Sequence, residues 1–89
     1  MDKHLATVYV ANLPWRTTED ELASLFEAYG PVVDVRVIQD PNTGRSRGYG
    51  FVELGAADSA QRAVVSLNGH EFNGRRLVVS PARPKRGRI

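Results

Sequence analysis

Aromatic side chains at alternating positions are the chemically most distinctive feature of this sequence of 89 residues. Tyr49 and Phe51 stand two positions apart in the octapeptide Arg47–Leu54, whose composition is typical of a β-strand. Side chains at that spacing on a strand point to the same face of the sheet. Two rings on one face can stack against a flat ligand, and an unstacked nucleobase is a ligand of that shape.

Other kinds of chemistry lack the residues that they need. The sequence has no cysteine, which excludes disulfides and thiolate chemistry, and His4 and His70 have no partners at metal-ligand spacing. No acid–base or nucleophile–base constellation is present. A domain of this size buries only about 60 to 65% of its unfolded surface, which leaves little room for a deep cleft. We therefore expect a protein that is not an enzyme and that uses no metal or cofactor.

Positive charge is concentrated at the end of the chain. The formal net charge is +2, yet residues 82–89 carry four basic side chains and no acid, so the remainder is net negative. Short basic segments typically make flexible contacts with polyanions, although many only keep a protein soluble. We expect residues 83–89 to form a basic tail that contacts phosphates through Arg83, Lys85 and Arg86.

The pattern of apolar and turn-forming residues predicts six elements in the order βαββαβ. Thr18 and Glu21 form a capping-box pattern at the start of the first helix, and Gly30-Pro31 ends it. Asn68-Gly69 ends the second helix, and Pro81 follows the last strand. The expected elements are strand 7–11, helix 19–29, strands 32–39 and 47–54, helix 58–67 and strand 76–80.

This order favours a ferredoxin-like α+β fold. Helical crossovers are right-handed, and two such units in one sheet give the split βαβ arrangement. We therefore expect a four-stranded antiparallel sheet with both helices on one face.

Strand parity predicts which side chains the helices cover. The alternating aliphatic residues are expected to form the core, and they are Val8, Val10, Val35, Val37, Val52, Leu54, Leu77 and Val79. Tyr9, Tyr49 and Phe51 have the opposite parity and should face solvent, and Gly50 on the helix side should permit close approach. The reverse assignment would bury Glu53 unpaired, at a cost of about 2 kcal/mol or more. A tail folded back over the rings is the other alternative.

Two segments carry a resemblance to a known family. Arg47–Leu54 resembles the RNP1 motif of the RNA recognition motif, K/R-G-F/Y-G/A-F-V-x-F/Y, at its first seven positions. Val8–Leu13 is similar to the RNP2 hexamer of that family. The resemblance implies a domain over residues 5–82, most like compact bacterial RNA-binding proteins with a single such motif. Leu54 departs from the motif, and its inward parity places the change in the core.

The resemblance also implies a binding mechanism for single-stranded RNA. Tyr9 and Phe51 would each stack on a base, Tyr49 would lie between the two sugars, and Arg47 would pair with the intervening phosphate. Each stack should contribute about 1–3 kcal/mol without selecting a base. Base preference would come from the last strand and the residues after it, around Val78, Ser80, Ala82 and Arg83.

Four further residues have two interpretations each. Asn12 either contacts RNA or bonds its own backbone in a turn. Trp15 either packs against the edge of the domain or adds a fourth ring. Arg36 and Ile38 have the outer parity of their strand, and they either touch an extended ligand or form a solvated edge.

The alternative function is a protein-binding module that uses the helical face. The first helix is acidic at Glu19, Asp20, Glu21 and Glu27, but acids near a helix N-terminus have an electrostatic explanation of their own. The Arg-x-Phe signature of that subclass is absent from residues 70–74. Acylphosphatases share the fold, but their glycine-rich anion loop is missing after the first strand.

The remaining expectations concern partners and location. Single-stranded RNA is the expected ligand, with single-stranded DNA bound more weakly. No apolar run approaches the roughly 20 residues of a membrane span, so no membrane contact is expected. We expect a monomer that is cytoplasmic, or nuclear in a eukaryote.

Overall fold

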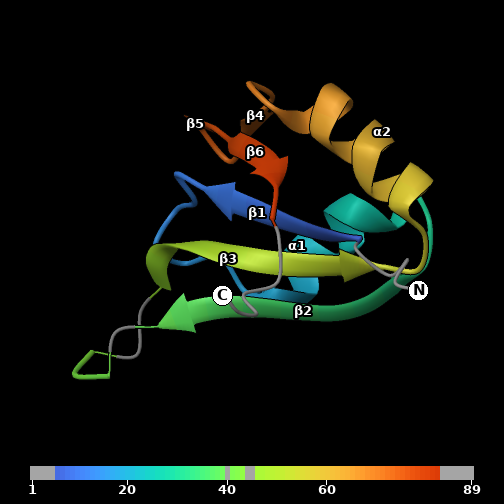
Figure 1. The fold of residues 1–89 in the computed structure, drawn as a ribbon. Helices are drawn as coiled ribbons and strands as arrows, with labels where there is room; N and C mark the ends of the chain where they lie inside the picture. Colours follow the sequence, from blue (N-terminus) through green and yellow to red (C-terminus); the bar gives the residue numbers. More distant parts are fainter. Residues whose placement is uncertain (1–5, 40, 44–45, 83–89) are drawn as a thin grey trace, which may run out of the picture.

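The computed structural model describes residues 6–39, 41–43 and 46–82, and for residues 46 and 47 it describes the backbone only. The predicted order of the six main elements is confirmed. In chain order the elements are β1 (Thr7–Ala11), α1 (Glu19–Glu27), β2 (Val32–Gln39), β3 (Ser46–Leu54), α2 (Ala57–Leu67), β4 (Glu71–Phe72), β5 (Arg75–Arg76) and β6 (Val78–Pro81) (Figure 1).

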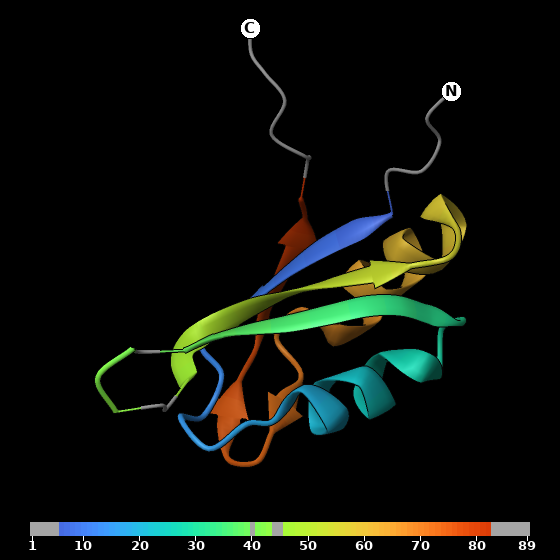
Figure 2. The same ribbon diagram turned by 90° about the horizontal axis from the view of Figure 1, so that it is seen from below.

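The main sheet has the strand order β2-β3-β1-β6, and every neighbouring pair is antiparallel. Both helices lie on the same side of this sheet, with α1 against β2 and α2 against β6 (Figure 2). The predicted ferredoxin-like arrangement is therefore present. The opposite face of the sheet is not covered by either helix.

Helix α1 begins at the predicted capping box. The Thr18 hydroxyl accepts the Glu21 N–H at 3.1 Å, and the Glu21 carboxylate accepts the Thr18 N–H at 3.3 Å. The helix ends two residues before the predicted Tyr29, because its last turn tightens: the Tyr29 N–H bonds the Phe26 carbonyl at 2.9 Å.

A carboxylate in the first turn of α1 joins the helix to the sheet. The Glu19 side chain accepts the Val37 N–H at 3.1 Å, and this bond is partly buried. Strand β2 lies at the edge of the sheet, so the Val37 N–H meets no further strand on that side. Glu19 thus fixes α1 against β2.

A short hairpin before the last strand was not predicted. Asn73 and Gly74 have positive φ angles of 50° and 89°, the conformation of a tight two-residue turn, and they pair β4 with β5. Leu77 then bonds back to Gly69 and His70, at 2.8 and 3.0 Å, and does not pair with β1. The last strand consequently spans 78–81 and not the predicted 76–80.

The core lies between the sheet and the helices, as strand parity predicts. Of the eight aliphatic residues expected there, seven are buried and Val35 is half-buried against them. Phe26 and Leu22 of α1 are fully buried among these side chains. Leu54, the residue that departs from the motif, is 2% exposed, so its change from an aromatic lies in the core.

Gly50 allows β2 and β3 to approach each other closely. It pairs with Val37, and a Cβ atom built on it would overlap the Arg36 carbonyl oxygen and lie 3.1 Å from the Val37 Cα. Both obstacles are backbone atoms, which cannot rotate away. A side chain at position 50 would therefore push the edge strand outward.

We expect Gly50→Ala to lower the free energy of unfolding by about 1–3 kcal/mol, the usual cost of overpacking. Gly55→Ala is the matched control, because a Cβ there would meet its neighbours only at 3.8 Å or more. Urea denaturation followed by circular dichroism measures both variants. Equal stabilities of the two variants would contradict the proposed backbone overlap.

Candidate functional site

Three aromatic rings form a cluster on the open face of the sheet. Tyr9 on β1 pairs directly with Phe51 on β3, and Tyr49 lies two residues before Phe51. The ring centroids are 5.7 Å apart for Tyr9 and Phe51, 6.1 Å for Tyr9 and Tyr49, and 6.3 Å for Tyr49 and Phe51. These spacings are typical of tilted and edge-to-face aromatic pairs. The three rings thus pack against one another while each stays partly exposed.

The alternation of the strands positions this cluster. Val8, Val10 and Val52 are completely buried on the helix side, and each adjoins one of the rings in sequence. Because consecutive side chains point to opposite faces, burying these valines turns Tyr9 and Phe51 outward. The predicted orientation of the three rings is therefore confirmed.

A row of cross-strand neighbours places a polar residue on each side of two of the rings. The strand register places Arg36, Phe51, Tyr9 and Ser80 directly next to one another, from β2 to β6. Ser80 is half-buried, and Val78 on the same face of β6 is 49% exposed. Two of the residues expected to give base preference therefore flank the aromatic cluster.

The basic residues expected to contact phosphates lie at the limits of what the structure describes. Arg47 belongs to β3 by its backbone, but its side chain lies outside the described part of the chain, as do Arg83, Lys85 and Arg86. Ala82 is the last described residue, and its N–H bonds the Thr7 carbonyl at 2.9 Å. The described part of the chain therefore ends beside the first residue of β1.

Asn12 has a third role that neither interpretation foresaw. Its φ angle is 64°, its amide nitrogen donates to the Arg76 carbonyl at 2.7 Å, and its amide oxygen accepts from the Arg75 guanidinium at 2.8 and 3.3 Å. The interpretation that Asn12 bonds its own backbone is therefore wrong. Its side chain ties the end of β1 to the β4–β5 hairpin. These partners are more than 60 residues away, so no local pattern could have indicated them.

Trp15 lies in the loop after β1 and is 48% exposed. The Arg16 guanidinium lies 4.8 Å from its ring centroid, within the range of a cation–π contact. One planar group therefore already covers part of this ring.

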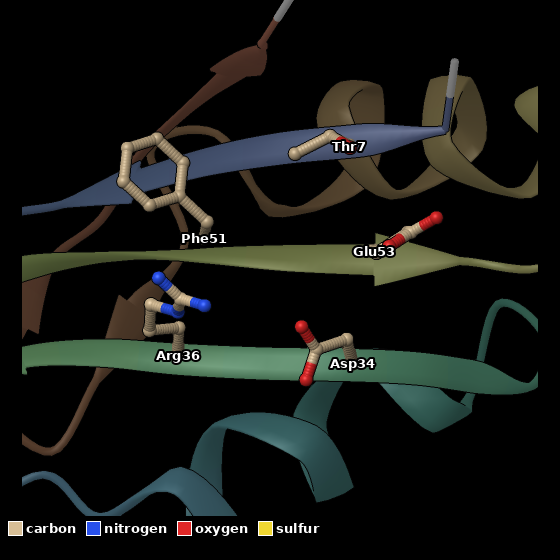
Figure 3. Close-up of a pocket in the computed structure, with 5 residues that line it drawn as sticks. All are labelled: Thr7, Asp34, Arg36, Phe51 and Glu53. Carbon is tan, nitrogen blue, oxygen red and sulfur yellow. The ribbon is translucent and has the colours of Figure 1, made fainter. Parts of the chain in front are cut away.

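A shallow hollow of about 210 Å³ adjoins the ring of Phe51 (Figure 3). It lies over β1, β3 and β2, toward the end of β3, and its lining residues are Thr7, Asp34, Arg36, Phe51 and Glu53. Of its polar residues, only Arg36 was considered as a contact from the sequence. Outer parity could have indicated Thr7 and Glu53 as well.

The helical face carries a second hollow, of about 580 Å³, where α2 passes the end of α1. Arg62 crosses it, bonding Asp58 at 3.1 Å and the Tyr29 carbonyl at 3.3 Å. Val65 at its margin is 78% exposed. This is the surface that the alternative function would use.

In the part of the chain that the structure describes, no cluster of His, Asp and Glu side chains could hold a metal ion. Across the same residues, no helix has the length and apolar character needed to cross a membrane.

Comparison with known proteins assigns the chain to one family. Residues 8–78 match the family described as RNA recognition motif. The chain is 48% identical over 81 residues to the 29 kDa ribonucleoprotein A, chloroplastic, of Nicotiana sylvestris. This match covers 89% of this chain and 30% of that protein. The match covers at most 44% of the length of the curated relatives that the chain matches first.

Solved structures agree with this match. The crystal structure of RNA Binding Protein PG1 superimposes with a TM-score of 0.83 at 47% identity, covering 89% of this chain and 98% of that one. The SXL-lethal protein/RNA complex gives a TM-score of 0.84 at 41% identity, covering 90% of this chain and 48% of that one.

Replacing Asn12 tests the bonds between β1 and the hairpin. Asn12→Ala removes these bonds and also places alanine at a positive φ angle. Asn73→Ala, at φ 50°, makes the same backbone change where no side-chain bond is recorded among the described residues. We expect Asn12→Ala to cost about 1–2 kcal/mol more than Asn73→Ala in free energy of unfolding, measured by thermal and urea denaturation. Equal losses of unfolding free energy in the two variants would show that the Asn12 side-chain bonds contribute nothing to stability.

Proposed function

The chain belongs to the RNA recognition motif family, and we propose that it holds single-stranded RNA across the open face of its sheet by stacking bases on Tyr9 and Phe51. The observation that carries this proposal is the cluster of three partly exposed rings on a face that neither helix covers. The similarity to a solved protein/RNA complex, at 41% identity over 90% of the chain, supports it.

The proposed contacts follow the strand register. A base on Tyr9 would lie beside Ser80, and the next base, on Phe51, would lie beside Arg36. Tyr49 is 6.1 and 6.3 Å from the other two rings, which suits a position between two sugars. Arg47, which follows Ser46 at the start of β3, would bind the phosphate between the bases as a charged donor fork.

We propose that the last strand and the tail extend this surface. Val78 and Ser80 face the ligand side of β6, and Ala82 is bonded to Thr7 of β1. The domain would end at residue 82, and Arg83, Lys85 and Arg86 would contact phosphates of the bound strand. Asn12 would act mainly by positioning the hairpin, because both ends of its amide are occupied.

The helical face is the weaker candidate. Two of its four acids have structural partners, since Glu19 accepts the Val37 N–H and Glu21 completes the capping box. Val65 is exposed there, but the aromatic rings lie on the other side of the sheet. A protein-binding role for this face therefore rests on one exposed valine and a hollow.

The finer expectations remain predictions. They are a role without catalysis, a monomer in the cytoplasm, weaker binding of single-stranded DNA, and a likeness to compact bacterial proteins. The curated relatives do not support the bacterial source, because they include plant, fungal and animal proteins. Some of these relatives are chloroplast proteins.

Removing a ring from the sheet tests the binding face. We expect Phe51→Ala to weaken binding of a short single-stranded RNA by about 1–3 kcal/mol, the contribution of one stacked base. Val65→Ala, an apolar truncation on the helical face, should leave the affinity unchanged. Fluorescence anisotropy measures binding, and thermal denaturation checks that Phe51→Ala stays folded. The reverse pattern, with only Val65→Ala weakening binding, would place the RNA on the helical face.

Neutralising the tail tests its contact with phosphates. Replacing Arg83, Lys85, Arg86 and Arg88 by Gln keeps the length of the chain and removes its charge. We expect lower affinity, with the salt dependence flattened by about 0.7 units for each lost phosphate contact on a single strand. Titrations at several salt concentrations measure this slope. A slope equal to that of the unaltered chain would show that the tail makes no such contact.

A further inference from the structure

Two acidic side chains face each other on the proposed RNA-binding surface. Asp34 of β2 pairs directly with Glu53 of β3, and Thr7 of β1 pairs with Glu53 from the other side. Like charges directly opposite each other on a sheet are destabilising. Across the residues that the structure describes, no ion pair is recorded for either carboxylate. The fold therefore keeps a costly pair of acids beside a surface that is proposed to bind a polyanion.

These two acids border the hollow next to Phe51. Asp34 and Glu53 line it together with Thr7 and Arg36, and Figure 3 shows all of these side chains on one face of the sheet. Arg36 is the cross-strand neighbour of Phe51, about 5 Å away between strands, and Glu53 is about 7 Å further along β3. A base stacked on Phe51 would thus extend its polar edge over the hollow.

The hydrogen-bonding groups of the hollow are three charged side chains and the Thr7 hydroxyl, which can both donate and accept. The charged side chains are of two kinds. The carboxylates of Asp34 and Glu53 only accept hydrogen bonds, and the guanidinium of Arg36 only donates them. A base that fits must therefore present neighbouring N–H donors to the acids and an acceptor to Arg36.

Guanine meets this requirement better than the other bases. Its N1–H and N2–H₂ groups lie side by side, and its O6 acceptor is adjacent to them. On the same edge, uracil has a single N–H between two carbonyl oxygens. These oxygens would repel a carboxylate. Adenine and cytosine each present one amino group on this edge, which can satisfy only one of the two acids.

We propose that the hollow lined by Thr7, Asp34, Arg36, Phe51 and Glu53 selects guanine for the base that stacks on Phe51. Asp34 and Glu53 accept from N1–H and N2–H₂, and Arg36 donates to O6. This inference rests on the proposed function, because it assumes that a base lies on Phe51. It gives the stacking site a base preference that the rings alone cannot supply.

The acids also act against the wrong ligand. A phosphate placed in the hollow would leave both carboxylates facing further oxygen atoms, and a uracil would leave at least one of them unpaired. Unpaired groups of this kind discriminate strongly between ligands. The cost of the cross-strand pair in the free protein is thus relieved when guanine is bound.

The test compares short oligouridines that carry one central guanosine, inosine, adenosine or cytidine with the plain oligouridine, using the full chain. We expect the guanosine oligomer to bind about tenfold more tightly than the plain one. Inosine lacks the N2 amino group, so its oligomer should lose most of this advantage. In the double variant Asp34→Asn, Glu53→Gln, the ratio of affinities should fall close to one, mainly because the plain oligouridine binds better.

The matched control is Asp20→Asn, Glu27→Gln, which removes the same charge from α1 and should keep the guanosine preference. Wild-type affinities that do not depend on the base, or a preference that the double variant retains, would overturn the guanine pocket. Those results leave the proposed function standing, provided that Phe51→Ala still weakens binding. Failure of every oligomer to bind would instead remove the proposed function and the pocket together. The inosine comparison needs no variant, so the proposal stays testable if the double variant does not fold.

Discussion

The alternation of side chains along β1 and β3 is the constraint on which the rest of this structure depends. Helices cover one face of the sheet only, so the aliphatic residues of β1 and β3 lie on that face and the alternate residues face the other way. Val8 and Val10 on β1 and Val52 on β3 are fully buried. Their neighbours in sequence, Tyr9 and Phe51, must therefore point to the open face. The same burial that stabilises the domain therefore displays Tyr9 and Phe51.

The open face is organised by contacts among its own side chains and by close packing of the strands. The three rings lie within 6.3 Å of one another, which limits the ways in which each can turn. Gly50 lets β2 lie close against β3, and this approach brings Arg36 beside Phe51. The stacking surface and its polar margin are thus both products of how two strands pair.

Much of this arrangement could be predicted from the sequence, because it follows from local patterns. The capping box gave the start of α1, and period-two alternation gave the buried and open faces of the sheet. Long-range pairings could not be predicted in this way. The bonds from Asn12 to the hairpin and from Glu19 to Val37 depend on which segments the fold brings together. The pairing of Asp34 with Glu53 shares one register with the pairing of Arg36 with Phe51, and a shift between Val37 and Gln39 separates this register from the hairpin end. An irregularity of this kind leaves no pattern in the sequence.

The bond between Glu19 and Val37 has a consequence for crowding. Exposed edge strands can join the sheets of neighbouring molecules, and this hazard grows when many copies are held close together. A single-stranded RNA with several binding sites would hold copies of this domain side by side. Because a carboxylate already occupies the Val37 N–H on the edge of β2, an incoming strand would have to displace it before pairing there. Under the proposed RNA binding, this occupied Val37 N–H would hinder pairing between the sheet edges of neighbouring copies.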